Sequence, residues 1–140
     1  MNNLELWDYA SEKLPVVKKW GWDAFSKWFF YMKEKGFAEI FMEKGCITGI
    51  GVARPLATQD QIEDRYAFDE SGHIAYVDCF TCDSKNKDVF LKRLILATGL
   101  RKKIGFKRLS KQKFVSYDMV KFMERLKNYG HINSGTTGSA

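Results

Sequence analysis

Apolar residues recur at helical spacing through the first forty positions of the chain. Two stripes can be followed, one through Leu4, Trp7, Ala10 and Leu14, and the other through Trp22, Phe25, Phe29 and Met32. This spacing predicts two helices, and Pro15 predicts a break or a new first turn near it. Because the second stripe is very aromatic, we expect it to be buried against a sheet. The alternative is a surface for a partner protein.

From residue 38 the spacing changes to the alternation that is typical of strands. Residues 38–53 predict a hairpin with its turn at residues 43–45. The Arg54-Pro55 pair predicts the end of the second strand, because proline donates no hydrogen bond to a neighbouring strand. Within that strand, Gly49 and Gly51 predict a bulge or a close approach of another element.

A polar, acidic segment separates this hairpin from the strongest strand pattern of the chain. Residues 56–72 predict a long connection, with a short helical turn near residues 59–65. Residues 73–81 then predict a strand. Its side chains alternate between one face with Ile74, Tyr76 and Asp78 and another with Ala75, Val77 and Cys79.

The last part of the chain predicts two strands between two helices. A polar break at residues 83–87 precedes an amphipathic helix over residues 89–98. Strands are expected at residues 104–109 and 113–117. A final helix is expected from about residue 118 to residue 128.

Length and composition fit one packed domain. The chain has 140 residues, of which 45% are hydrophobic and 15% aromatic. We expect residues 1–130 to form this domain and the small polar residues 131–140 to form a flexible tail. No apolar run has the length of a membrane span, and the first residues lack a signal-peptide pattern. Three cysteines without framework spacing predict reduced thiols, so we expect a soluble intracellular or virion protein without membrane contact.

Charge is divided unevenly along the chain. Residues 1–84 contain 9 Lys and Arg against 14 Asp and Glu, a net charge of −5. Residues 85–140 contain 14 Lys and Arg against 3 Asp and Glu, a net charge of +11. We therefore expect this part to bind an anionic partner. The candidate residues are Arg101, Lys102, Lys103, Lys107, Arg108, Lys111 and Lys113.

This basic stretch suits several partners. Contacts of Lys and Arg with phosphates would bind nucleic acid without sequence specificity. Other protein subunits are an alternative, including the acidic loop 60–70 of a neighbouring copy in a head-to-tail assembly. A solvated surface that only aids solubility is the remaining interpretation.

The order of the expected elements resembles that of the GNAT acyltransferase fold over roughly residues 4–117. Residues 38–53 are similar to its first long hairpin, and residues 73–82 are similar to its central strand, which splits from its neighbour. Residues 86–100 are similar to the helix whose N-terminus cradles the coenzyme A pyrophosphate. The resemblance, which extends to phage-encoded GNAT-like and virion proteins, implies a mixed, mostly antiparallel α+β sheet fold. Two N-terminal helices, a central crossover helix and a C-terminal helix would accompany that sheet.

The phosphate loop of the family is similar to Gln/Arg-x-x-Gly-x-Gly/Ala, and its glycines let backbone N–H groups approach the phosphates. Residues 81–87 hold no glycine here, and Asp83 places a negative charge where a phosphate would lie. If coenzyme A binds, the resemblance implies that the residues holding it are Ser84, Lys85, Asn86 and Lys87.

For an enzyme of this family, the resemblance implies Tyr117 as general acid and Asp78 as general base. Alternatively, Tyr117 packs on the sheet, and Asp78 is solvated or bonded to a neighbouring strand. Cys79 and Cys82 form a C-x-x-C pair. Residues three apart on a strand point to opposite faces, so we expect no metal site there.

These observations together predict a non-catalytic GNAT-like structural or accessory protein of a phage virion. It would contact nucleic acid or other subunits through its basic C-terminal third, hold no cofactor, and reside in the virion or the host cytoplasm. The alternative is an acetyl-CoA-dependent N-acyltransferase with an atypical pyrophosphate loop. A plain nucleic-acid-binding module of α+β type is a third possibility.

Overall fold

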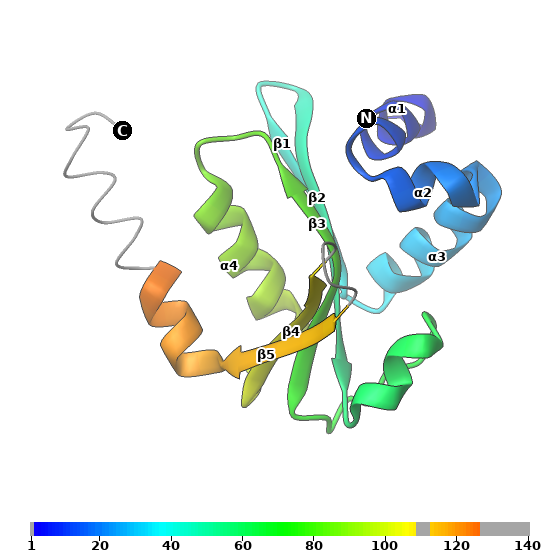
Figure 1. Ribbon diagram of the computed structural model, residues 1–140. Helices are drawn as coiled ribbons and strands as arrows, with labels where there is room; N and C mark the ends of the chain where they lie inside the picture. Colours follow the sequence, from blue (N-terminus) through cyan, green and yellow to red (C-terminus); the bar gives the residue numbers. More distant parts are fainter. Residues whose placement is uncertain (1, 109–112, 127–140) are drawn as a thin grey trace, which may run out of the picture.

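A central sheet lies between two helical layers in the computed structural model, which describes residues 2–108 and 113–126 (Figure 1). Three helices, α1 to α3, cover one face, while α4 and a helix over residues 119–126 cover the other. The helices are α1 (Asn3–Lys13), α2 (Pro15–Trp20), α3 (Trp22–Glu34), the 3-10 helix η1 (Gln59–Glu63) and α4 (Lys87–Thr98). The strands are β1 (Ala38–Glu43), β2 (Cys46–Leu56), β3 (Ile74–Cys82), β4 (Lys103–Arg108) and β5 (Lys113–Asp118).

The general α+β class is confirmed, but the prediction of two N-terminal helices is wrong. The new first turn predicted near Pro15 is confirmed, and it begins a separate helix, α2, because the missing N–H of proline needs no partner in a first helical turn. The helix over residues 119–126 begins where the last helix was expected. The remainder of that predicted helix and the predicted tail at residues 131–140 lie outside the described residues.

The sheet has the strand order β1-β2-β3-β4-β5 and is mostly antiparallel. Only the β3–β4 pair among the described strands is parallel, and α4 forms the crossover between them. That pairing joins Ile74, Ala75 and Tyr76 to residues 103–105. Beyond Tyr76 the two strands diverge.

Strand β2 continues through Pro55 to Leu56, so the prediction that it ends at Arg54-Pro55 is wrong. Strand β1 reaches only as far as Val52, and β2 therefore has no strand beside Pro55 on that edge. The carbonyl of Pro55 accepts a hydrogen bond from the Asp69 N–H at 2.8 Å on the same edge. Because no strand lies beside Pro55 on this edge, the absence of a proline N–H removes no hydrogen bond between strands.

A bulge in β3 changes which side chains face which helices. The register passes from the pair Val52–Cys79 to the pair Ala53–Val77, so Asp78 is the extra residue. Cys79 therefore packs with the core under α1 to α3, whereas Val77 packs on the α4 side. The predicted grouping of Cys79 with Val77 on one face is wrong for this reason.

The core is divided between the two faces of the sheet. The aromatic stripe of α3 is buried against the sheet, as predicted, at Phe25, Phe29 and Met32, whereas Trp22 is partly buried and Trp28, beside the stripe, is also buried. On the other face, Gly49 and Gly51 of β2 allow a close approach of α4, and a bulge precedes Gly49, so both alternatives that the two glycines predicted are present. A Cβ at Gly49 would lie 2.9 Å from the Phe90 ring, and one at Gly51 would lie 2.8 Å from Leu94.

Candidate functional site

The divergence of β3 and β4 opens a cleft of about 610 Å³, here called the β3–β4 cleft. Five consecutive residues of β3, 76–80, line it. Because successive side chains of a strand point to opposite faces, such a run can line one cavity only along the edge of the strand. Ile104, Phe106 and Lys107 of β4 form the opposite wall.

Both helical layers close the sides of the β3–β4 cleft. Residues 14–17 and Trp20 line it on the side of α1 to α3. Leu91 of α4 and Phe122 line it on the other side. A mostly apolar concavity of this volume with a few charged side chains is typical of a ligand site.

Arg54 and Asp78 form a buried ion pair at the cleft. Arg54 is fully buried and donates from Nε and Nη2 to the two carboxylate oxygens of Asp78, at 2.9 and 3.2 Å. Its guanidinium also donates to the backbone carbonyls of Gln61, Ile62, Asp64 and Ala67. Burial raises the pKa of Asp78 to about 6, although the charge and hydrogen bonds of Arg54 act in the opposite direction.

The structure does not bring the two proposed catalytic residues together. Tyr117 lies opposite Ile104 in the β4–β5 pairing, on the α4 side of the sheet. Its ring lies 5.7 Å from that of Phe106 and 6.4 Å from that of Phe122. Asp78 points to the other face, where Arg54 holds it.

The loop between β3 and α4 holds the residues that the family resemblance assigned to coenzyme A. These residues are Ser84, Lys85, Asn86 and Lys87. Glu43 of β1 accepts hydrogen bonds from the Ser84 hydroxyl at 2.9 Å and from the Asn86 amide at 2.8 Å. These two hydrogen bonds lower the pKa of Glu43. Asp83 in the same loop forms an ion pair with Lys13 at 3.2 Å.

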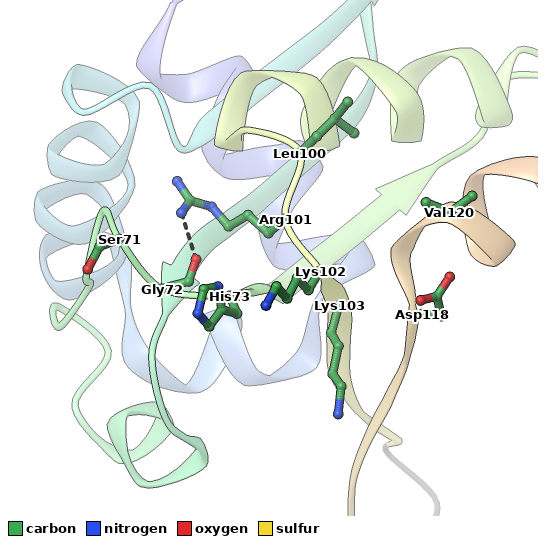
Figure 2. A pocket seen from close by; sticks show the side chains of 9 residues that line it. All are labelled: Ser71, Gly72, His73, Leu100, Arg101, Lys102, Lys103, Asp118 and Val120. Carbon is green, nitrogen blue, oxygen red and sulfur yellow. Dashed lines mark hydrogen bonds between the residues drawn. The ribbon is translucent and has the colours of Figure 1, made fainter.

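Part of the basic stretch lines a second, open pocket of about 700 Å³, shown in Figure 2. Arg101 is bound to the backbone there, since it donates to the Glu70 carbonyl at 2.7 Å and to the Gly72 carbonyl at 2.8 Å, the second of which is drawn in Figure 2. Lys102 and Lys103 are exposed in the same pocket. The remaining lining residues are Ser71, His73, Leu100, Asp118 and Val120.

The other basic candidates lie elsewhere. Lys107 forms an ion pair with Glu63 at 3.8 Å beside the β3–β4 cleft. Lys113 of β5 pairs with Arg108 of β4. Successive residues of a strand point to opposite faces, so Lys113 lies on the face of the sheet opposite to that of Lys107. The side chain of Arg108 and all of Lys111 lie outside the described part of the structure. The described members of the set are thus divided between several surfaces.

Sequence reasoning missed the roles of Arg54, Arg65 and Glu43. Arg65 stacks over the Trp20 ring at 3.9 Å in the cleft wall, and its carbonyl accepts from the Trp28 indole at 2.8 Å. An arginine within the otherwise apolar run of β2 was a usable sign of a buried ion pair. Nothing local in the sequence signals the contact of Glu43 with a loop 41 residues away.

Comparison with known proteins leaves the family resemblance as a prediction. No protein-family model, no curated protein and no solved structure matches the chain. None of the helices in residues 2–108 and 113–126 has the length and apolar character needed to cross a membrane. The same residues hold no cluster of three or more metal-binding side chains. Cys79 and Cys82 lie on opposite faces of the sheet, since Cys82 pairs with Gly49 on the α4 side.

Proposed function

We propose that the chain is a non-catalytic GNAT-like structural or accessory domain that binds a partner protein in the β3–β4 cleft. The family assignment is part of this proposal. Parallel strands joined by a crossover helix, with a cleft where they diverge, are the arrangement that the resemblance implies. The phage origin stays a prediction from the resemblance alone.

The contact of Glu43 with Ser84 and Asn86 is the observation that carries the non-catalytic part of the proposal. At this corner the resemblance would place the pyrophosphate of coenzyme A. Two of the side chains assigned to it already donate to a carboxylate of the chain itself. A bound pyrophosphate would have to displace the Glu43 carboxylate from these donors and would be repelled by it. These contacts therefore disfavour the cofactor.

Calorimetry with acetyl-CoA tests the proposal. We expect no saturable binding to the intact chain at millimolar acetyl-CoA. Binding with a Kd below about 100 µM would overturn the non-catalytic function, provided that it is lost in the Lys85→Ala/Lys87→Ala double variant. Lys33→Ala/Lys35→Ala on α3 serves as the matched control for the change in total charge.

An acetyl-CoA-dependent N-acyltransferase is the second candidate, and Asp78 is the observation that favours it. The Asp78 carboxyl lines the β3–β4 cleft, and a pKa of about 6 suits a general base near neutral pH. Against this role, both of its oxygens are bound by Arg54. If this candidate is correct, the chain will transfer acetyl groups from acetyl-CoA to amines, and Asp78→Asn will abolish the transfer.

A further inference from the structure

We infer that the partner of the β3–β4 cleft is an extended peptide that adds to the open edge of β3 as an extra strand. The inference rests on the proposed function, because it names the partner of the same site. Strand β3 pairs with β2 from Ile74 to Cys82, but with β4 only as far as Tyr76. Among the described residues, positions 77–82 thus have a neighbouring strand on one edge only.

The backbone of this open edge favours an extended ligand. Unpaired N–H and C=O groups of a strand are a template for another strand, and backbone groups in an apolar setting cost free energy unless they are hydrogen-bonded. The five residues of β3 that line the cleft span about 16 Å, which matches the length of an ordinary strand. Main-chain pairing along this edge would supply affinity without requiring one particular sequence.

The walls of the cleft indicate which side chains such a peptide carries. Alternate side chains of an inserted strand would point to the two faces of the sheet. On one face they would meet Val17 and Trp20, and on the other Leu91 and Phe122. Both sets of positions are apolar, so the peptide is apolar on both faces, like a strand in the middle of a covered sheet.

The charged side chains of the cleft indicate that the peptide also carries one acidic residue. Asp78 is paired with Arg54, and Lys107 is paired with Glu63. Arg65 forms no ion pair within the described residues and lies over Trp20 at the wall. The charge of Arg65 also attracts Asp78, but among the described residues no carboxylate lies within ion-pair distance of it, and an Asp or Glu side chain of the peptide would supply that contact.

A set of synthetic peptides tests the inference. Each has about seven residues of valine and isoleucine, with one glutamate moved through the positions and a polyethylene glycol tail for solubility. Fluorescence anisotropy should show that at least one position gives a Kd below about 50 µM. Matched peptides with alternate amide nitrogens methylated keep their side chains but lose strand pairing, and they should bind at least about tenfold more weakly.

Two tryptophan variants on one helix locate the peptide. Leu91→Trp fills the cleft and should weaken binding at least about tenfold, whereas Leu96→Trp on the exposed side of α4 should leave it unchanged. Circular dichroism melts confirm that both variants are folded. Arg65→Gln should remove the preference for glutamate. Hydrogen exchange should slow at those amides of residues 77–82 that face the open edge, whereas the amides of the same segment that face β2 should change less.

Different outcomes separate the inference from the proposed function. If no peptide binds below millimolar concentration, or if methylated peptides bind equally well, the strand-addition inference is wrong. Should acetyl-CoA also fail to bind, the non-catalytic function still stands. Saturable binding of acetyl-CoA that Leu91→Trp blocks would instead overturn both, because the cofactor and not a peptide would then occupy the cleft.

Discussion

At the scale of single residues, the geometry of the β3–β4 cleft depends most directly on Arg54. Its guanidinium has no exposed surface and binds one carboxylate and four backbone carbonyls. A buried charge is tolerated only when its partners are complete, so each of these contacts is needed. Arg54 thereby joins the loop around η1 to β2 and β3.

Replacing Arg54 should destabilise the fold strongly. Arg54→Met leaves Asp78 buried without its cation, and we expect a loss of about 3–5 kcal/mol in the free energy of unfolding, measured by urea denaturation. Arg93→Met removes the exposed ion pair with Glu39 and should cost less than about 1 kcal/mol. Similar losses in the two variants would contradict the structural role of Arg54.

Asp78 should make stability depend on pH between about 4 and 6. Its carboxyl has a pKa raised to about 6 in the folded chain, against about 4 in an unfolded chain. Between these values the folded state binds more protons, so the free energy of unfolding falls as pH rises. The contribution of this one group amounts to about 2–3 kcal/mol across that interval.

Carbon-13 NMR of the side-chain carboxyl measures the Asp78 pKa directly. A midpoint near 6 is expected for Asp78. A midpoint below about 4 would mean that Arg54 outweighs burial, and the pH dependence would then have the opposite sign.

At the scale of elements, the packing of α4 on β2 decides where the cleft can form. Gly49 and Gly51 let Phe90 and Leu94 approach the backbone of β2 closely. The hydroxyl of Thr98 donates to the Ala53 carbonyl at 2.7 Å and fixes the C-terminal end of α4. This close packing leaves Leu91, on the same helix, at the edge of the cleft.

An added methyl group at Gly51 should therefore be costly. Gly51→Ala places a Cβ 2.8 Å from Leu94, and we expect a loss of about 1–3 kcal/mol in thermal or urea unfolding. In a Leu94→Ala background the same change should cost clearly less, since the contact is gone. Additive losses in this double-mutant cycle would show that the cost does not arise from the contact with Leu94.

Sequence patterns predicted the elements of this fold better than their details. Alternation was sufficient for the β1–β2 hairpin, and glycine placement for an irregularity or close approach in β2, because both depend on local residues, although the glycines did not identify α4 as the approaching element. Neither the continuation of β2 through Pro55 nor the bulge at Asp78 has a local cause. The first depends on β1 ending early, and the second on pairing with a distant strand. No local residue pattern locates the cleft, for the same reason, and only the family resemblance implied that the central strand splits from its neighbour.

At the scale of the whole molecule, the uneven charge of the chain does not produce one continuous basic surface among the described residues. Arg101 is bound to backbone carbonyls, and Lys107 is paired with Glu63. Lys102 and Lys103 remain exposed together in the open pocket. If nucleic acid binds to the described part of the chain, these two lysines are the best-placed contacts for its phosphates.

DNA binding can be tested through its dependence on salt. Any affinity for a short duplex should fall linearly on a log–log plot against salt, by about 0.9 in slope for each phosphate contact. Lys102→Gln/Lys103→Gln should make the slope shallower by about 2, whereas Lys33→Gln/Lys35→Gln on α3 should leave it unchanged. An identical slope in all three proteins would exclude the pair as phosphate contacts.

The bonds of Arg54 and Trp28 to backbone carbonyls have a mechanical consequence. They hold the wall of the cleft that contains Ile62 and Arg65 to β2 and to α3. Moving this wall outward would leave the buried Arg54 guanidinium without its carbonyl acceptors, and water does not reach it to replace them. The facing wall, β4, pairs with β3 at three positions and with β5 at six, and its Ile104 packs in the core under α4. Because its pairing with β3 is so short, β4 together with β5 is the wall that we expect to move when the cleft widens to admit a peptide.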